Sequence, residues 1–209
     1  MTAVRDKLPV RRDAPSQTPN EGNWTVHKPD LREDFHEHCG YCGSYDGFRH
    51  TWFEVDHFIP KSFLLLTGNI SNVEYSNLVY SCKFCNNKKL SKWPSKSETV
   101  FHINNEGFVD PCDVDFDNHL HRANDGSIMW STPLGKWMVT EAFRFDERQD
   151  SIKVLWNLNE TRKVIDSLIE LMSQEVEGSQ EYDIIKSKAE EYSLKYYIFH
   201  KELINFYNE

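Results

Sequence analysis

Apolar and β-branched positions in the first half of the chain gather in short runs that predict a small mixed structure. Residues 51–60 (Thr-Trp-Phe-Glu-Val-Asp-His-Phe-Ile-Pro) predict a strand that ends at its proline. Residues 77–81 predict a second, shorter strand, and residues 86–92 predict a helix that a following proline stops. The local order is therefore strand, loop, strand, helix.

Polar and turn-forming residues separate these elements. Asp30 is a candidate N-cap for a short helix over residues 31–38. Residues 63–76 are expected to form a loop, with Gly68 and Asn69 as its turn formers. Residues 100–150 contain several glycines and prolines between short apolar pieces such as residues 127–130, which predicts irregular structure with a hairpin.

From residue 152 onward the apolar spacing becomes helical. Val164, Leu168 and Leu171 share one face of a first predicted helix. A second run keeps spacings of three and four throughout, and it comprises Ile185, Ala189, Tyr192, Tyr196, Phe199, Leu203 and Phe206. The break at residues 177–179 (Glu-Gly-Ser) predicts an α-helical hairpin.

These patterns predict an α+β chain with four parts. Residues 1–29 carry scattered prolines and charges, which favours an extended N-terminal arm without its own core. Residues 30–99 form the predicted core, residues 100–150 an irregular region with short strands, and residues 151–209 a C-terminal α-helical hairpin.

The charge is unevenly distributed along the chain. The whole sequence has 24 Lys and Arg against 33 Asp and Glu, a net charge of −9, which disfavours nucleic-acid binding. Residues 49–96, however, hold seven basic and three acidic side chains. The acidic excess lies in residues 102–209, which we expect to dock onto a partner or a second copy of the chain, not onto DNA.

Hydropathy and the N-terminus indicate the compartment. The longest purely aliphatic run is Leu64 to Leu66, which is too short to span a membrane. Residues 1–19 are polar and lack the apolar stretch of a secretory signal. We therefore expect a cytoplasmic protein without a membrane partner, where clustered cysteines indicate a metal more often than a disulfide.

Four cysteines predict a structural zinc site. Cys39 and Cys42 form one C-x2-C pair, and Cys82 and Cys85 form another. Four thiolates complete the tetrahedral coordination of Zn²⁺ and leave no open position, so this site would stabilise the fold without taking part in the chemistry. Cys112 is left over and is expected to be a buried or loop thiol.

The segment between the two cysteine pairs carries candidate catalytic groups. Asp56 offers a carboxylate, Asn86 a carbonyl oxygen and His57 an imidazole, while Asn77 begins the second predicted strand. A one-metal phosphodiesterase needs oxygen ligands for a hard divalent cation. It also needs a base with a pKa near neutral. Adjacent strand residues point to opposite faces, so Asp56 and His57 can serve one site only where the strand ends or twists.

The segments Glu54-Val-Asp-His-Phe-Ile-Pro-Lys61, Asn77-Leu-Val and Cys82-x-x-Cys85-Asn86-x-x-Lys89 resemble the HNH endonuclease motif over about residues 39–92. The resemblance implies a ββα-metal core of the zinc-bound kind. By it His57 is the general base, Asp56 a metal-binding acid and Asn77 the central asparagine that holds the catalytic loop. Asn86 stands in place of the last histidine, which makes this an HNN variant and favours Mg²⁺ or Mn²⁺.

Basic residues around the motif are candidate phosphate contacts. The resemblance gives this role to Lys89 and Lys61, and the position of the 86–92 helix extends it to Lys88 and Lys92. The implied reaction is hydrolysis of DNA. A metal held by Asp56 and Asn86 would stabilise the leaving 3′-oxygen, and His57 would deprotonate the attacking water to leave a 5′-phosphate.

The second half of the chain gives a weaker resemblance. Phe108-Val-Asp-Pro-Cys112, Gly126-Ser-Ile and Leu155-Trp-Asn-Leu-Asn159 followed by Arg162 are similar to stand-alone HNH proteins of bacterial anti-phage operons, such as the nuclease partner of Septu-type systems. This resemblance implies an antiviral effector held by an ATPase or another defence protein. One HNH site cuts one strand, so a double-strand break would need a homodimer or two successive nicks.

Two other interpretations fit the same residues. The first is a non-catalytic zinc module that binds nucleic acid or a partner protein through the 83–96 helix and the C-terminal aromatic face. The second is a nuclease of the same type acting on RNA, such as tRNA. Cleavage assays on plasmid and tRNA, with variants of Asp56 and His57, distinguish the three.

Overall fold

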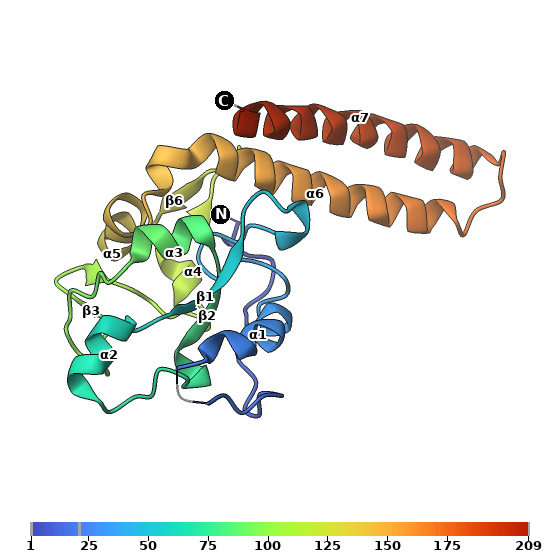
Figure 1. Cartoon of the computed structure of the whole chain (residues 1–209). Coiled ribbons are helices and arrows are strands. Elements are labelled where there is room, and N and C mark those ends of the chain that lie inside the picture. Colours follow the sequence, from blue (N-terminus) through green and yellow to red (C-terminus); the bar gives the residue numbers. More distant parts are fainter. Residues whose placement is uncertain (1, 21, 209) are drawn as a thin grey trace. The chain divides into compact units, whose positions relative to one another are not determined.

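A computed structural model describes residues 2–20 and 22–208, with side chains up to residue 206 (Figure 1). The chain forms two compact units, residues 1–149 and 150–209, and each unit is described by itself.

The strands are β1 (Phe53–His57), β2 (Leu78–Cys82), β3 (His102–Ile103), β4 (Glu106–Gly107), β5 (Leu120–Arg122) and β6 (Ile128–Trp130). The α-helices are α1 (Lys28–Asp34), α2 (Lys61–Thr67), α3 (Lys83–Lys89), α4 (Phe116–His119), α5 (Pro133–Trp137), α6 (Gln149–Met172) and α7 (Gln180–Asn208). Short 3-10 helices cover Trp24–His27, Asp46–Phe48, Tyr75–Asn77 and Phe145–Arg148, and a π-helical turn covers Met138–Ala142.

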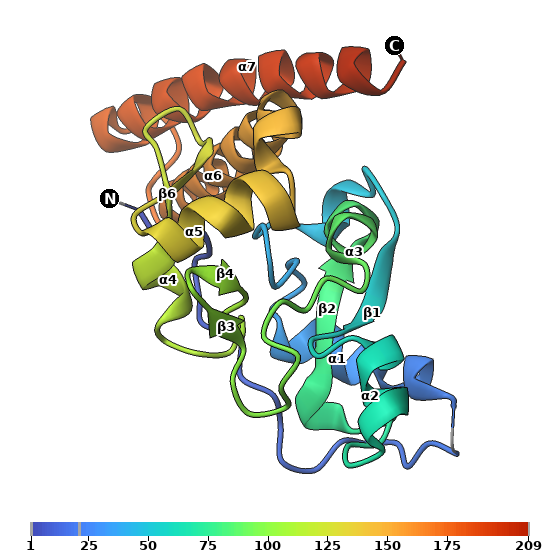
Figure 2. The same ribbon diagram turned by 90° about the vertical axis from the view of Figure 1, so that its left-hand side faces the viewer.

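The antiparallel hairpin of β1 and β2 is the centre of the first unit (Figure 2). Its register pairs Phe53 with Cys82 and Asp56 with Val79. Every residue of β2 is buried. Helix α3 follows β2 directly and packs on the face that carries Asp56, whereas α1 lies near the opposite face, which carries Phe53 and Tyr80. The predicted strand, strand, helix order is present, and the fold is mixed α and β as expected.

Several predicted boundaries differ from the structure. The first helix begins at Lys28 and ends at Asp34, because Asp30 does not cap it but lies inside its first turn. The loop expected over residues 63–76 is wrong in its first part, where α2 runs from Lys61 to Thr67. Gly68, expected as a turn former, ends α2 with a left-handed φ of 70°.

Helix α3 begins three residues before the expected start at Asn86. It takes in Cys85 in its first turn, and it ends before the predicted stop because Leu90 has a positive φ of 49°. Asn86 and Lys89 therefore lie on consecutive turns of one helix, which places both near β1.

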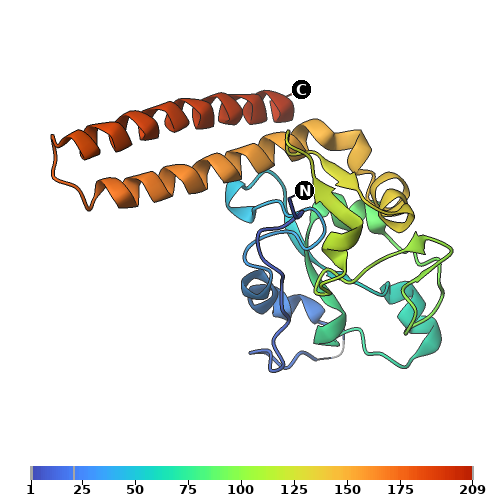
Figure 3. The same cartoon turned by 180° about the vertical axis from the view of Figure 1, so that it is seen from behind.

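The N-terminal segment is extended but packs closely on the rest of the first unit (Figure 3). Thr2 bridges to Arg122 in β5, and the side chain of Val4 is fully buried. Arg11 donates to the carbonyl of Leu78 in β2 at 2.7 Å and pairs with Asp110 at 2.9 Å. The expected extended arm is thus bound along its length and supplies part of the core around the hairpin.

Residues 100–149 are more ordered than their glycines and prolines predict. β3 pairs with β4, and β5 pairs with β6, so the region contains hairpins of the kind expected there. A chain of ring contacts connects Phe58 through Trp93 and Phe108 to Phe143. This aromatic core attaches the region to the end of β1.

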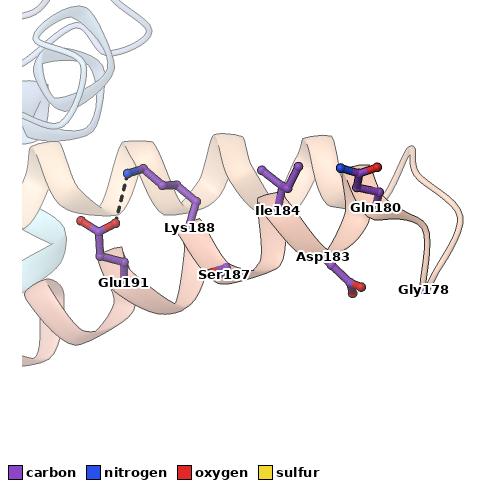
Figure 4. Close-up of a pocket in the computed structure, with 7 residues that line it drawn as sticks. All are labelled: Gly178, Gln180, Asp183, Ile184, Ser187, Lys188 and Glu191. Atoms are coloured by element: carbon purple, nitrogen blue, oxygen red, sulfur yellow. Dashed lines mark hydrogen bonds and ion pairs between the residues drawn. The ribbon is translucent and has the colours of Figure 1, made fainter.

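The second unit is the C-terminal helical hairpin. α6 and α7 run antiparallel around the turn predicted at residues 177–179 (Figure 1). An open hollow near this turn is lined by Gly178 and by residues of α7, among which Lys188 pairs with Glu191 at 3.0 Å (Figure 4). None of the helices in the described part of the chain has the length and apolarity needed to cross a membrane.

Candidate functional site

The four cysteines of the two C-x2-C pairs meet in one buried cluster. Cys39 and Cys42 lie in the turn after α1, Cys82 ends β2 and Cys85 lies in α3. The four Sγ atoms all lie within 4.8 Å of one another, and those of Cys42 and Cys82 are 3.8 Å apart. Tetrahedral zinc with bonds of about 2.3 Å places its sulfur ligands roughly 3.8 Å apart. The donor set and its spacing therefore fit a structural zinc ion.

The charges around the cluster also fit a metal. Burial raises the pKa of the Cys85 thiol well above its usual range, whereas hydrogen bonds from Cys39 and the other thiols lower the pKa of Cys42. A metal ion is bound by the thiolate form of cysteine, so binding at this buried cluster would release protons. Arg148 is buried beside it, and its Nη2 donates to the Sγ of Cys85 at 2.9 Å. A zinc ion with four thiolates has a net charge of about −2, which this guanidinium partly offsets.

Three oxygen-bearing side chains gather between β1 and α3. Glu54 and Asp56 are two residues apart on β1 and so share one face. Asn86 on α3 donates its Nδ2 to the carboxylate of Glu54 at 2.7 Å. This bond fixes the amide, and it leaves the carbonyl oxygen of Asn86 as the atom able to bind a cation. Glu54 thus orients a candidate ligand.

Asp56 is held by two buried partners. The hydroxyl of Tyr41 donates to its Oδ2 at 2.6 Å, and the ammonium of Lys89 lies 3.1 Å from the same atom. Lys89 also donates to the carbonyl of His57 at 2.6 Å. The carboxylate is therefore fixed in one orientation at the end of β1, with Oδ1 on its other side.

His57 lies on the other face of the strand, where β1 ends. Its Nε2 is 2.8 Å from the carbonyl oxygen of Asn72, which can only accept, so Nε2 carries the proton and Nδ1 is the basic nitrogen. Its ring contacts Trp24 edge to face at 4.9 Å, and Lys61 lies over the Trp24 ring at 4.2 Å. Burial lowers the pKa of His57, which keeps the imidazole neutral and able to accept a proton.

Asn77 clamps the backbone that follows His57. Its Oδ1 accepts from the N–H of Ile59 at 2.8 Å, and its Nδ2 donates to the carbonyl of the same residue at 3.1 Å. The backbone of Asn77 accepts a further bond from Phe58. These contacts hold the loop after β1 in the way expected of a central asparagine.

The lysines of α3 are not placed as the sequence predicts. The phosphate contact expected of Lys89 is wrong, because its ammonium is fully buried and paired with Asp56. Lys88 pairs with Glu147 at 2.9 Å, and Lys92 donates to the carbonyl of Ala142 at 3.0 Å. The phosphate contacts expected of Lys88 and Lys92 stay predictions, in competition with these bonds.

Four residues around the site were missed by the sequence reasoning. Tyr41 donates to Asp56, and Arg148 donates to Cys85. The other two, Trp24 and Asn72, both contact His57. Only Tyr41 has a local signal, since it lies inside the first C-x2-C turn. The leftover Cys112 is a half-buried thiol outside the metal cluster, as expected, and burial raises its pKa to about 11.

The family model described as HNH endonuclease matches residues 39–92, which is well under half of the chain. No curated protein and no solved structure matches the chain. The matched residues run from the first zinc-cluster cysteine to the end of α3 and include the Asp56, His57, Asn77 and Asn86 positions. Motif, element order and family match coincide over the same residues, so residues 39–92 resemble an HNH endonuclease domain.

Proposed function

We propose that the chain is a divalent-metal-dependent endonuclease that hydrolyses phosphodiester bonds in DNA. The observation that carries the proposal is the arrangement at the end of β1. There Asp56 and Asn86 offer oxygen atoms on one side, and His57 is held on the other side with its basic Nδ1 available.

Each side chain has a distinct task in this proposal. Asp56 and Asn86 would hold Mg²⁺ or Mn²⁺, which when bound neutralises charge on the phosphate and on the leaving oxygen. His57 takes a proton at Nδ1 from the attacking water, and the bond to Asn72 stabilises the imidazolium that forms. Asn77 keeps the loop after His57 in place, and Lys89 with Tyr41 keeps the Asp56 carboxylate oriented.

The four cysteines would bind Zn²⁺ as a structural ion. Cys39 and Cys42 precede β1, whereas Cys82 and Cys85 join β2 to α3. A metal shared by these positions would fix the distance between Asn86 on α3 and Asp56 on β1. The zinc would thus support the catalytic oxygens without touching the substrate.

A place in anti-phage defence, with an ATPase or a second copy of the chain as partner, is a further part of the proposal. It is supported by the acidic second half and by exposed apolar side chains on the helical hairpin, among them Leu171, Ile184 and Tyr197. A cytoplasmic location would suit both the reduced cysteines and this role. Light scattering that shows a strict monomer, with no protein co-purifying, would count against the partner.

The proposal is tested by nicking of supercoiled plasmid in Mg²⁺ or Mn²⁺. We expect wild type to nick and His57→Ala to lose activity, while His102→Ala, a change of an exposed histidine in β3, keeps it. Equal nicking by wild type and His57→Ala would overturn His57 as the base. Faster cleavage of tRNA than of plasmid would favour the RNase interpretation, and zinc-dependent binding without any cleavage would favour the non-catalytic module.

A further inference from the structure

A basic hollow lies on the first unit away from Asp56 and Asn86. It is formed by α1, the segment before β1 and the first residue of α3, and has a volume of about 860 Å³. The stacked rings of Phe53 and Tyr80, with centroids 5.2 Å apart, line it. These residues lie on the α1 side of the hairpin, the face of β1 that also carries His57.

Three cations line this hollow without anionic partners. Lys28, Arg49 and Lys83 come from α1, from the loop before β1 and from α3. Within residues 2–20 and 22–208, none of the three has an ion-pair partner. The lining carboxylate of Asp46 is already neutralised, because Arg32 binds it through Nε at 2.6 Å and Nη2 at 3.1 Å. The hollow therefore keeps an excess of positive charge.

An exposed tryptophan stands beside these cations. Trp52 has 77% of its surface exposed, although indoles usually bury most of theirs. Its carbonyl accepts from the backbone N–H of Lys83 at 2.8 Å, which fixes its position next to α3. An exposed, anchored aromatic ring among unpaired cations is the combination that binds a nucleic-acid strand, with a base on the ring and phosphates on the cations.

We propose that this hollow, the Trp52 groove, binds one strand of the DNA substrate, with an unstacked base on Trp52 and phosphates on Lys28, Arg49 and Lys83. The inference rests on the proposed nuclease function and adds a substrate contact that the motif does not include. Trp52 directly precedes β1 and His57 ends it, so the two residues are about 16 Å apart at roughly 3.3 Å per extended residue. In a B-form duplex a strand advances about 3.4 Å per nucleotide, so about five nucleotides of duplex, and fewer of an unstacked strand, would separate Trp52 from the scissile phosphate.

The test measures binding separately from cleavage. Zinc-loaded protein without added Mg²⁺ or Mn²⁺ is titrated into a fluorescein-labelled single-stranded DNA 20-mer, and anisotropy gives Kd at several salt concentrations. Loss of one stacked base predicts a 5- to 150-fold weaker Kd for Trp52→Ala, the range equivalent to about 1–3 kcal/mol. Thermal melting of each variant shows that it is folded.

The cations are tested by a matched pair of triple variants. Changing Lys28, Arg49 and Lys83 to Gln removes three phosphate contacts, which lowers the slope of log Kd against log salt by about 2, at about 0.7 for each contact. The control changes three other exposed lysines to Gln, and these are Lys136, Lys186 and Lys201. It alters the net charge equally, and we expect it to keep the wild-type slope.

Five outcomes decide the inference. Unchanged Kd in Trp52→Ala overturns it, and so does an equal loss of slope in both triple variants, because charge alone would then explain the binding. Tighter binding of an RNA 20-mer of the same sequence overturns the assignment to DNA. Nicking that depends on His57, together with binding indifferent to Trp52, refutes the groove and leaves the proposed function standing. Binding that depends on Trp52 without any nicking refutes the function and supports the groove.

Discussion

Arg148 joins the end of the first unit to the four-cysteine cluster, and its removal should weaken metal binding there. The residue is only 8% exposed and donates to the Sγ of Cys85 at 2.9 Å. At an effective dielectric constant of about 20, two unit charges at this distance attract by roughly 6 kcal/mol. Burial of the guanidinium costs several kcal/mol in return, so the net effect is a smaller difference. We expect Arg148→Met to lower the affinity for zinc about 10- to 100-fold, the range typical for partners of metal ligands.

The assay is competition for zinc between the protein and a chromogenic chelator, at a temperature where all variants are folded. Arg144→Met is the matched control, because Arg144 is half-buried and pairs with Glu147, not with a cysteine. We expect the control to bind zinc as wild type does. A zinc Kd for Arg148→Met equal to that of Arg144→Met would refute the assigned charge balance.

Other predictions address the loop clamp, the zinc ligands and the catalytic oxygens. Asn77→Ala leaves the N–H and C=O of Ile59 buried without partners, which should lower the free energy of unfolding in urea by about 2–6 kcal/mol, at about 1–3 kcal/mol for each group; an unchanged midpoint would contradict the clamp. Cys85→Ser should remove bound zinc, measured by metal analysis, whereas Cys112→Ser should keep it; equal zinc contents would refute the four-cysteine site. Asn86→Ala should weaken Mn²⁺ binding, measured by electron paramagnetic resonance, with zinc content unchanged; wild-type Mn²⁺ affinity would remove Asn86 as a ligand.

The local parts of the site could be predicted from the sequence. The two C-x2-C pairs can be read directly from the sequence. The structure brings their four cysteines together, as the spacing predicts. The strand, strand, helix order also follows from nearby residues. Element ends were predicted less well, and α2 was missed because Gly68 signals a turn whether it interrupts a loop or ends a helix.

Pairing between distant residues could not be predicted. The basic side chains of α3 suggested phosphate contacts. In the structure, however, Lys88 pairs with Glu147, which is 59 residues away, and Lys89 is buried and paired with Asp56. Arg148 reaches Cys85 across 63 residues. The sequence shows how many charged side chains a segment has. Which of them remain without an ion-pair partner depends on the fold. The free cations of the Trp52 groove therefore emerge only from the structure.

The most direct test of the central claim is the ratio of single-turnover nicking rates for wild type and His57→Ala at saturating Mn²⁺. Loss of a general base typically slows a reaction by about 10²- to 10⁴-fold, and His57, whose Nε2 bond to Asn72 leaves Nδ1 basic, is the proposed base. We predict a ratio in that range, with the His102→Ala control near one. Wild-type nicking by His57→Ala would contradict the claim that the end of β1 is a phosphodiesterase site.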